Sequence, residues 1–378
     1  MSLTRLDTAG QVLVTKRVYA TTKAVQASPD GGCWVAGANK IARLTAEGTI
    51  RWSQAIEYYT GFYYNPVIIN SLITLSAGGS IFIGELERQR RDEMMMGKIS
   101  ATGQVEWMKS YTHPLRPGSP EDRGEVGNIV SMPDGKIVLL GYRDTNPRIF
   151  LTGFDDRGEV LWNKDVEIPG HNLWQAKLTC LADGSLVVVA TQTNNEQEVV
   201  LLQLTATGEV VRAQAIQGLK MDVSSVSMSP KGSATFVGHN NTNSMLLPGA
   251  RQGLFIAEMD ANWQPVQAAN SLEADPEGKW FSGFGRVLSA EGNYRYTLGN
   301  LIAPINGGIP VSFRLMKSKA VTGRICSSFD EQVTLTAKPA HAMVQDAIKP
   351  HMTVTTFQQQ PYVAEVYPYN VQGKRECQ

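Results

Sequence analysis

Short hydrophobic runs, each preceded by a turn signal, recur along most of the chain and predict β-strands. The runs CWVAG from Cys33, KIVLLG from Lys136 and SLVVVA from Ser185 are examples. Runs of this length, rich in β-branched residues and bounded by Gly-containing turns, are typical of strands. We therefore expect an all-β chain built from short strands and many tight turns.

A tight turn followed by such a run occurs six times. The copies begin SPDGGCWVAG, SAGGSIFIG, MPDGKIVLLG, LADGSLVVVA, SPKGSATFVG and SAEGNYRYTLG, with turn glycines Gly31, Gly78, Gly135, Gly184, Gly232 and Gly292. These glycines are 47 to 60 residues apart. Self-similarity at such a period indicates a repeat architecture, in which one supersecondary unit is used again and again.

A second signature, a strand, a tight turn and another strand, lies between successive copies of the first. Its copies are LTAEGTIRW, ISATGQVEW, FDDRGEVLW, LTATGEVV and MDANWQPV, and LDTAGQVLV at the N-terminus is a further one. Trp52, Trp107 and Trp162 each fall four residues after the turn glycine. Their identical place in successive repeats predicts packing between repeats rather than a platform for a sugar or a quinone. Asp155 and Asp156 are interpreted as turn residues, because Asp tolerates and hydrogen-bonds a tight turn.

Each repeat thus has four strands, A to D, in about 50 residues, which predicts a β-propeller of four-stranded antiparallel blades. Six A–B hairpins and seven C–D hairpins favour seven blades, the terminal blade being closed by N- and C-terminal strands. Six blades is the alternative. We expect residues 1–326 to be the propeller repeats and residues 327–378 to be a C-terminal β segment that completes the last blade or packs on the propeller. Strand-like runs at 332–337, 352–357 and 362–367 are candidates to pair with the N-terminal hairpin.

The repeat PDGGCWVAGANKIARLTAEGTIRWSQAI from Pro29 resembles bacterial propeller repeats found in secreted and cell-surface proteins. It is also similar to the blades of pyrroloquinoline quinone dehydrogenases and of propeller lipoproteins that help to assemble the outer membrane. The resemblance covers residues 2–326 and implies the fold, not an activity. The dehydrogenase family usually carries a ring of adjacent cysteines, which this chain lacks, so we predict no cofactor.

Loop lengths predict which face of the blades recognises a partner. In an up-and-down blade the A–B and C–D connections share one face, and these connections are nearly all tight. The connections of the other face are long, at 57–70, 85–97, 112–127, 239–253, 271–283 and 300–310. Loops on a rigid scaffold commonly carry binding, so the long-loop face is the expected recognition surface.

Two of these connections supply the candidate binding residues. The segment EYYTGFYYNP contains Tyr58, Tyr59, Phe62, Tyr63 and Tyr64. Tyrosines offer a large rigid contact area with a polar tip, although such rings also pack between blades. The segment ELERQRRDEMMMGK contains the further candidates Arg88, Arg90 and Arg91. Its residues 94–96, three methionines, are expected to be an adaptable surface for a partner, with a solvated hairpin tip as the alternative.

Charge and motifs limit the remaining classes of function. The chain has 378 residues with 35 Lys plus Arg against 35 Asp plus Glu, which argues against a nucleic-acid partner held by a dominant basic field. Phosphate-binding, hydrolase, HExxH and EF-hand motifs are absent from the sequence, and its five histidines are scattered, so we predict no catalytic and no metal-binding residues. The sequence contains no run of 18 or more apolar residues, so we do not expect membrane insertion.

The sequence therefore predicts a non-enzymatic binding propeller that recognises a protein or a surface glycan. The alternatives are an enzyme with a cross-blade channel site, either quinone-dependent or glycan-acting, and a structural subunit of a larger secretion or particle assembly. The resemblance and a Cys326–Cys377 link, which the sequence leaves open, favour an extracytoplasmic setting. The lack of a visible signal peptide argues against this setting. The oligomeric state is left open.

Overall fold

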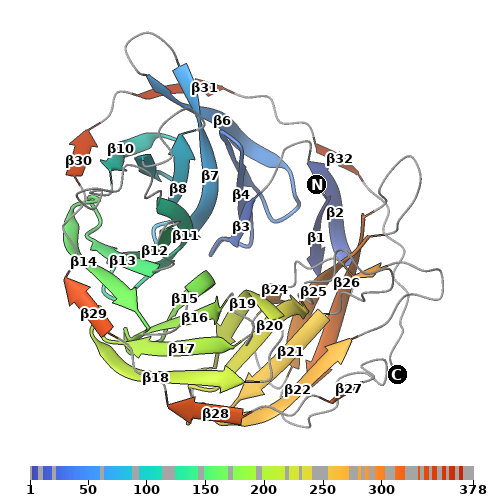
Figure 1. Ribbon diagram of the computed structural model, residues 1–378. Helices are drawn as coiled ribbons and strands as arrows, with labels where there is room; N and C mark the ends of the chain where they lie inside the picture. Colours follow the sequence, from blue (N-terminus) through green and yellow to red (C-terminus); the bar gives the residue numbers. More distant parts are fainter. Residues whose placement is uncertain are drawn as a thin grey trace. The chain divides into compact units, whose positions relative to one another are not determined.

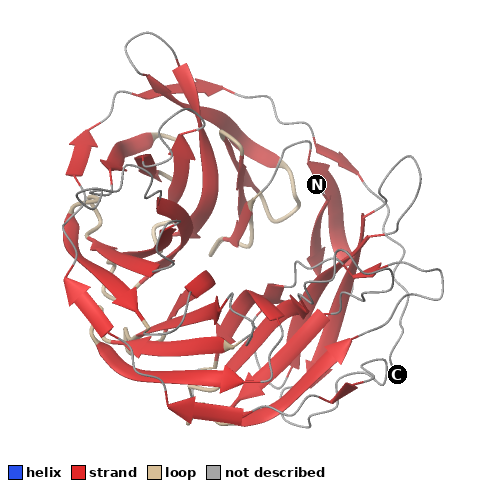
Figure 2. Ribbon diagram, viewed as in Figure 1, coloured by secondary structure: helices blue, strands red, loops and turns tan. Residues whose placement is uncertain are grey.

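The protein is described by a computed structural model in which every regular element is a β-strand (Figures 1 and 2). The residues that the structure describes are 2–6, 12–18, 23–59, 64–86, 93–112, 124–143, 149–168, 173–192, 198–217, 221–229, 232–240, 254–271, 280–281, 286–288, 294–302, 311–319, 331–332, 336–339, 343–346, 351–354, 357–361 and 366–368. The chain divides into two compact units. Unit 1 comprises residues 1–146, 150–165 and 346–376, and unit 2 comprises residues 147–149, 166–345 and 377–378.

Unit 1 contains four-stranded antiparallel sheets in which sequential strands are neighbours. The first has the order β3 (Ala24–Ala27), β4 (Cys33–Gly37), β5 (Lys40–Leu44) and β6 (Ile50–Tyr59). The second has the order β7 (Tyr64–Thr74), β8 (Ser80–Leu86), β9 (Glu93–Ile99) and β10 (Val105–Thr112). The third, apart from a few terminal residues, is β11 (Gly124–Ser131), β12 (Ile137–Arg143), β13 (Ile149–Phe154) and β14 (Val160–Glu167). An N-terminal hairpin pairs β1 (Ser2–Leu6) with β2 (Val12–Val18).

Unit 2 repeats the same pattern. One sheet has the order β15 (Leu173–Cys180), β16 (Leu186–Gln192), β17 (Val199–Leu204) and β18 (Val210–Gln217), and the next has the order β19 (Met221–Met228), β20 (Ala234–Asn240), β21 (Leu254–Met259) and β22 (Pro265–Ser271). In the last sheet, β25 (Tyr294–Ile302) pairs with β23 (Trp280–Phe281), β24 (Arg286–Leu288) and β26 (Val311–Lys319). These sheets confirm the predicted all-β propeller class, while the number of blades stays a prediction.

The turns inside the blades have the chemistry that the sequence predicted. Nine turn glycines have φ between 75° and 90°: Gly31, Gly48, Gly78, Gly103, Gly135, Gly158, Gly184, Gly208 and Gly232. At Gly103 the backbone N–H donates to the Ser100 carbonyl at 3.0 Å, which closes the turn between strands C and D. A side chain at this φ is strained, so glycine is the natural residue there.

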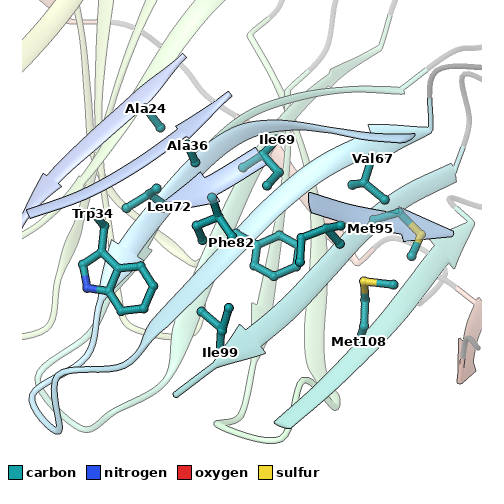
Figure 3. Close-up of a cluster of buried hydrophobic side chains, with 12 residues drawn as sticks. Ala24, Trp34, Ala36, Val67, Ile69, Leu72, Phe82, Met95, Ile99 and Met108 are labelled. Atoms are coloured by element: carbon teal, nitrogen blue, oxygen red, sulfur yellow. The ribbon is translucent and has the colours of Figure 1, made fainter. Parts of the chain in front are cut away.

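Hydrophobic clusters fill the space between successive sheets. Figure 3 shows one such cluster, in which Trp34 from the first sheet and Phe82 from the second are fully buried. The inner strands β8 and β9 send alternate residues to opposite faces, so Met95 joins this cluster while Met94 and Met96 join the next one. The expectation that these three methionines form an exposed partner surface was wrong: they are 2%, 0% and 0% exposed. A strand in the middle of a blade is covered on both faces, and Met fills irregular core space well.

Two of the three repeated tryptophans, Trp52 and Trp107, connect neighbouring blades as predicted, whereas Trp162 lies against Gly153 of its own sheet. Trp52 Nε1 on β6 donates to the Ala101 carbonyl in the C–D turn of the next sheet at 3.0 Å. A Cβ added to Gly103 in that turn would lie 2.9 Å from Trp52 Cδ2. The same arrangement recurs at Trp107, whose Nε1 donates to the Asp156 carbonyl at 3.3 Å. Trp and Gly are therefore a matched pair across the boundary between two blades.

Unit 2 contains the same pair in reversed form. Arg212 on β18 occupies the position that Trp52 and Trp107 have on their strands, and Trp263 occupies the position of the turn glycine. Trp263 has φ 55° and is 2% exposed. The Arg212 guanidinium lies 4.8 Å from the centre of the Trp263 ring and donates to the Asn262 carbonyl. The large ring thus comes from the turn, and the strand supplies the long polar side chain.

C-terminal strands add an outermost strand, beside strand D, to the described sheets other than the one built around β25 (Figure 1). In unit 2, β27 (Glu331–Gln332) pairs with β22 and β28 (Thr336–Pro339) pairs with β18. In unit 1, β30 (His351–Val354) pairs with β10, β31 (Phe357–Pro361) with β6 and β32 (Val366–Pro368) with β2. The third sheet has the order β11-β12-β13-β14-β29, in which β29 is Met343–Asp346. Among the C-terminal strands that the structure describes, β32 alone pairs with the N-terminal hairpin. The expectation that the runs at 332–337 and 352–357 are candidates to pair there was wrong, because their strands lie on the D strands of other sheets.

Candidate binding surface

The tyrosine-rich segment is a β-hairpin and not a long loop. Strands β6 and β7 pair in the register Glu57↔Pro66, Tyr58↔Asn65 and Tyr59↔Tyr64. The expected loop at 57–70 is therefore mostly strand, because its β-branched and aromatic residues continue the D strand of one blade directly into the A strand of the next. The hairpin places the backbone of three candidate residues, Tyr58, Tyr59 and Tyr64, on two adjacent strands.

The root of this hairpin is held by the tight B–C turn of the first sheet. The Ile56 N–H donates to the Asn39 carbonyl at 2.7 Å, and the Ile69 N–H donates to the Ala38 carbonyl at 2.7 Å. Ala38 has φ 46°, a left-handed conformation that is uncommon for a residue with a side chain. Strand β7 has a register shift between Ile69 and Ser71, so the Ile69 N–H is satisfied by the turn at the point where the ladder to β8 is irregular.

Strand β31 extends the hairpin on its other side. Phe357 is paired with Tyr58, Gln358 with Glu57 and Gln359 with Ile56. Tyr58 thus has a backbone neighbour on each side, Asn65 on β7 and Phe357 on β31. Three antiparallel strands are stiffer than an isolated two-stranded hairpin, which is marginally stable in water. The base of the tyrosine hairpin is therefore a supported three-stranded ribbon.

The other candidate residues lie outside the described residues: Phe62, Tyr63, Arg88, Arg90 and Arg91. The strands that flank the arginine segment are described, and β8 ends at Leu86 while β9 begins at Glu93. Beside this segment, Glu85 Oε1 accepts a hydrogen bond from the Val126 N–H of β11 at 3.1 Å. Lys23 Nζ donates to Asn70 Oδ1 at 2.8 Å near the root of the tyrosine hairpin. The first of these contacts joins the second sheet to the third, and the other joins the first sheet to the second.

A buried arginine that the sequence analysis missed organises the A–B turn of the first sheet. Arg43 is 2% exposed and donates to Ser28 Oγ and to Asp30 Oδ1, each at 2.5 Å. Arg51 also contacts Asp30, with Nη1 2.9 Å from Oδ2. The Arg43 hydrogen bond and the Gly32 N–H lower the pKa of Asp30 to about 2. The group is a structural ion pair that stabilises a turn, and its sequence signal, a lone Arg in a hydrophobic strand, is easily read as a solvated charge.

A second polar cluster holds the C–D turn of the third sheet. Lys109 Nζ donates to the Arg157 carbonyl at 2.6 Å and to Glu159 Oε1 at 2.7 Å. Tyr111 Oη donates to the Gly158 carbonyl at 2.6 Å, and burial is the main cause that raises the pKa of Tyr111 above its usual range. Asp155 Oδ1 accepts the N–H groups of Arg157 and Glu159, as expected for a turn residue. These charged and aromatic groups serve contacts between blades.

In the part of the chain that the structure describes, no three His, Cys, Asp or Glu side chains are arranged to hold a metal ion. Cys33 and Cys180 are free thiols that are partly buried, and burial is the largest influence on Cys33, whose pKa is raised. The described elements also include no helix with the length and apolar character needed to cross a bilayer.

Comparisons with known proteins give similar folds at low similarity. No family model matches the sequence, and the search of curated proteins found no similar sequence. A protein of unknown function from Bacteroides caccae has 11% identity and a TM-score of 0.46 over 69% of this chain and 86% of that chain. An exo-β-1,3-galactanase from Clostridium thermocellum has 11% identity and a TM-score of 0.41 over 75% and 64% of the two chains. The polysaccharide lyase Uly1 has 8% identity and a TM-score of 0.41 over 80% and 91%.

These TM-scores are below 0.5, so they assign neither an activity nor a substrate to this chain. The resemblance to a bacterial repeat family likewise stays a prediction.

Proposed function

We propose that the chain is a non-enzymatic binding propeller that recognises a protein or a surface glycan through the tyrosine hairpin, residues 57–66. The observation that carries this proposal is the support of the hairpin on both sides. Its β6 strand pairs with β7 and with β31, and the Ala38 and Asn39 carbonyls accept backbone N–H groups at its root. A hairpin that is rigid before binding loses little conformational entropy when a partner docks.

The residue types of the hairpin suit recognition. Five aromatic residues occur between positions 58 and 64. Tyr rings combine a large apolar area with a hydroxyl group, and Tyr is enriched among residues that dominate binding energy. The overall charge balance of 35 to 35 argues against a partner that is held mainly by a dominant field of one sign.

The test replaces residues 60–63 by Asn-Gly, which retains the Tyr59↔Tyr64 pair and removes two aromatic residues. Asn-Gly is a favoured two-residue hairpin turn, so the strands should stay paired. A second variant changes Tyr58, Tyr59 and Tyr64 to Ser. We expect both variants to keep the urea midpoint of the parent and to lose partner capture from the native source and binding to a glycan array.

A matched control is Val211→Ser on β18, which alters a side chain that is 60% exposed next to a C–D turn. This variant should bind like the parent. Protease treatment of the source distinguishes the two partner classes, because it abolishes capture of a protein and spares capture of a glycan. If the Asn-Gly variant and the triple Ser variant both fold and still capture the same partner with parental affinity, the hairpin is not the recognition surface.

A further inference from the structure

The C-terminal strands obey one register rule. We refer to β27, β28, β30, β31 and β32 as the C-terminal belt. Each belt strand is antiparallel to a D strand, and its last paired residue lies opposite the D-strand residue six positions after the turn residue. The five pairs are Gln332↔Ala269, Pro339↔Gln214, Val354↔Lys109, Pro361↔Gln54 and Pro368↔Lys16.

Proline explains where most of these strands end. Three of the five end pairs contain Pro, namely Pro339, Pro361 and Pro368. Proline has no N–H group and cannot donate to a continuing ladder, so pairing ends at this residue. The belt visits the D strands in reverse chain order within each unit, with two to five residues on each strand.

The part of each D strand nearer its turn is protected in a different way. The ladders between C and D strands shift register between Arg43 and Leu44 in the first sheet and between Gln203 and Leu204 in unit 2. The extra residues at these bulges are Arg51 and Val211, which are exposed. A bulge twists an edge and interrupts its row of hydrogen-bonding groups. The bulge therefore blunts the first part of the D-strand edge, and the belt covers the part that follows.

We propose that the C-terminal belt is a strap donated by the chain to its own D strands, and that it closes these edges against a second copy of the chain. An uncovered D-strand edge is a row of free N–H and C=O groups that accepts another strand. The native pairing already proves that these edges accept an antiparallel strand, for example at Ala55↔Gln360. A D strand of another copy presents the same row, and two antiparallel copies form a self-complementary two-fold contact.

Disulfide trapping tests whether the strap is donated within one chain. Two double variants each place two cysteines at positions that pair within one unit. They are Ala55→Cys with Gln360→Cys in unit 1 and Ala215→Cys with Lys338→Cys in unit 2. The control, Ala55→Cys with Gln358→Cys, is displaced by two residues because Gln358 pairs with Glu57. In a background with Cys326 and Cys377 changed to Ser, we expect rapid intramolecular disulfides in the first two variants only. Equal trapping in the control, or disulfides only between copies, overturns the proposal.

Single proline substitutions test the closing of the edges in the full-length chain. Gln359→Pro uncovers part of β6 and Ala337→Pro uncovers part of β18, while Gln359→Val and Ala337→Val keep the ladders and serve as controls. Each proline affects one blade, so the other sheets remain folded by circular dichroism. Light scattering after size exclusion should give a doubled mass for the proline variants as concentration rises from micromolar to millimolar, and the parental mass for the valine variants. Folded proline variants that keep the parental mass throughout overturn the edge-closing role.

Discussion

Reversing the Arg212–Trp263 pair tests the view that each blade boundary in a unit holds one large ring, supplied either by the D strand or by the turn of the next blade. Trp263→Gly removes a side chain that is 2% exposed and belongs to a core cluster of unit 2. Truncating a buried Trp costs about 3 to 5 kcal/mol, and the lost contact with Arg212 adds about 0.5 to 2 kcal/mol. Relief of the left-handed backbone at φ 55° returns about 1 to 2 kcal/mol. We therefore expect the free energy of unfolding to fall by about 1.5 to 6 kcal/mol.

The second substitution, Arg212→Trp, should have opposite effects in the two backgrounds. With Trp263 present it forces two large rings into one space, and overpacking costs about 1 to 3 kcal/mol. With Gly at position 263 it recreates the arrangement of Trp52 and Gly103, in which the ring lies against the turn glycine. The double variant should thus be more stable than Trp263→Gly alone by about 1 to 3 kcal/mol, because the new ring fills the space that the old one left.

Urea unfolding of the parent, of Trp263→Gly, of Arg212→Trp and of the double variant gives the coupling energy between positions 212 and 263. The control is Val211→Trp in the Trp263→Gly background, because Val211 is 60% exposed on the neighbouring position and a ring there does not reach the vacated space. We expect no rescue from the control. If the effects of Arg212→Trp and Trp263→Gly simply add, the two residues are not a reversed Trp–Gly pair and the reasoning is refuted.

Three further predictions concern buried or paired groups. Asp30→Asn should remove the stability that the ionised Asp30 carboxylate gives to the folded state. This stability is fully present above the unfolded pKa of about 3.9 and is lost as pH falls through the folded pKa of about 2, so the urea stabilities of parent and variant should converge toward pH 2. A difference that is constant with pH contradicts this. Tyr111→Phe should lower the free energy of unfolding by about 1 to 3 kcal/mol, because the Gly158 carbonyl loses its buried donor; an unchanged urea midpoint contradicts the hydrogen bond. Met95→Ala should cost about 2 to 5 kcal/mol in the same assay, whereas an effect below about 0.5 kcal/mol would place this methionine at the surface.

Much of the blade could be predicted because local chemistry is written into each repeat. Turn glycines such as Gly103 occur where the backbone has positive φ, and Asp155 accepts the N–H groups of its own turn. Trp52 and Trp107 bind the next turn as their repeated position predicted. These features depend on residues that are close in sequence or one repeat apart, so a pattern search finds them.

The candidate site was predicted in part. The segment with Tyr58, Tyr59 and Tyr64 was identified from composition, but its hairpin form depends on pairing between two blades. The burial of Met94 to Met96 was not predicted. Three apolar residues next to charged ones occur both in exposed loops and in central strands, so the sequence pattern does not distinguish the two. Only the sheets on both sides of β9 decide between these possibilities.

The sequence by itself determined the repeat, the four strands of each blade and the tight turns, because backbone conformation in a turn depends on the residue at that position. Tertiary structure alone decided where the C-terminal strands pair. Strands of two to five residues carry too little side-chain pattern to select a partner, so their place is set by the hydrogen-bonding edge left open after the bulge of each D strand and by proline at the end of three of them. The same holds for Arg212 and Trp263, whose sizes make sense only when the two blades are in contact.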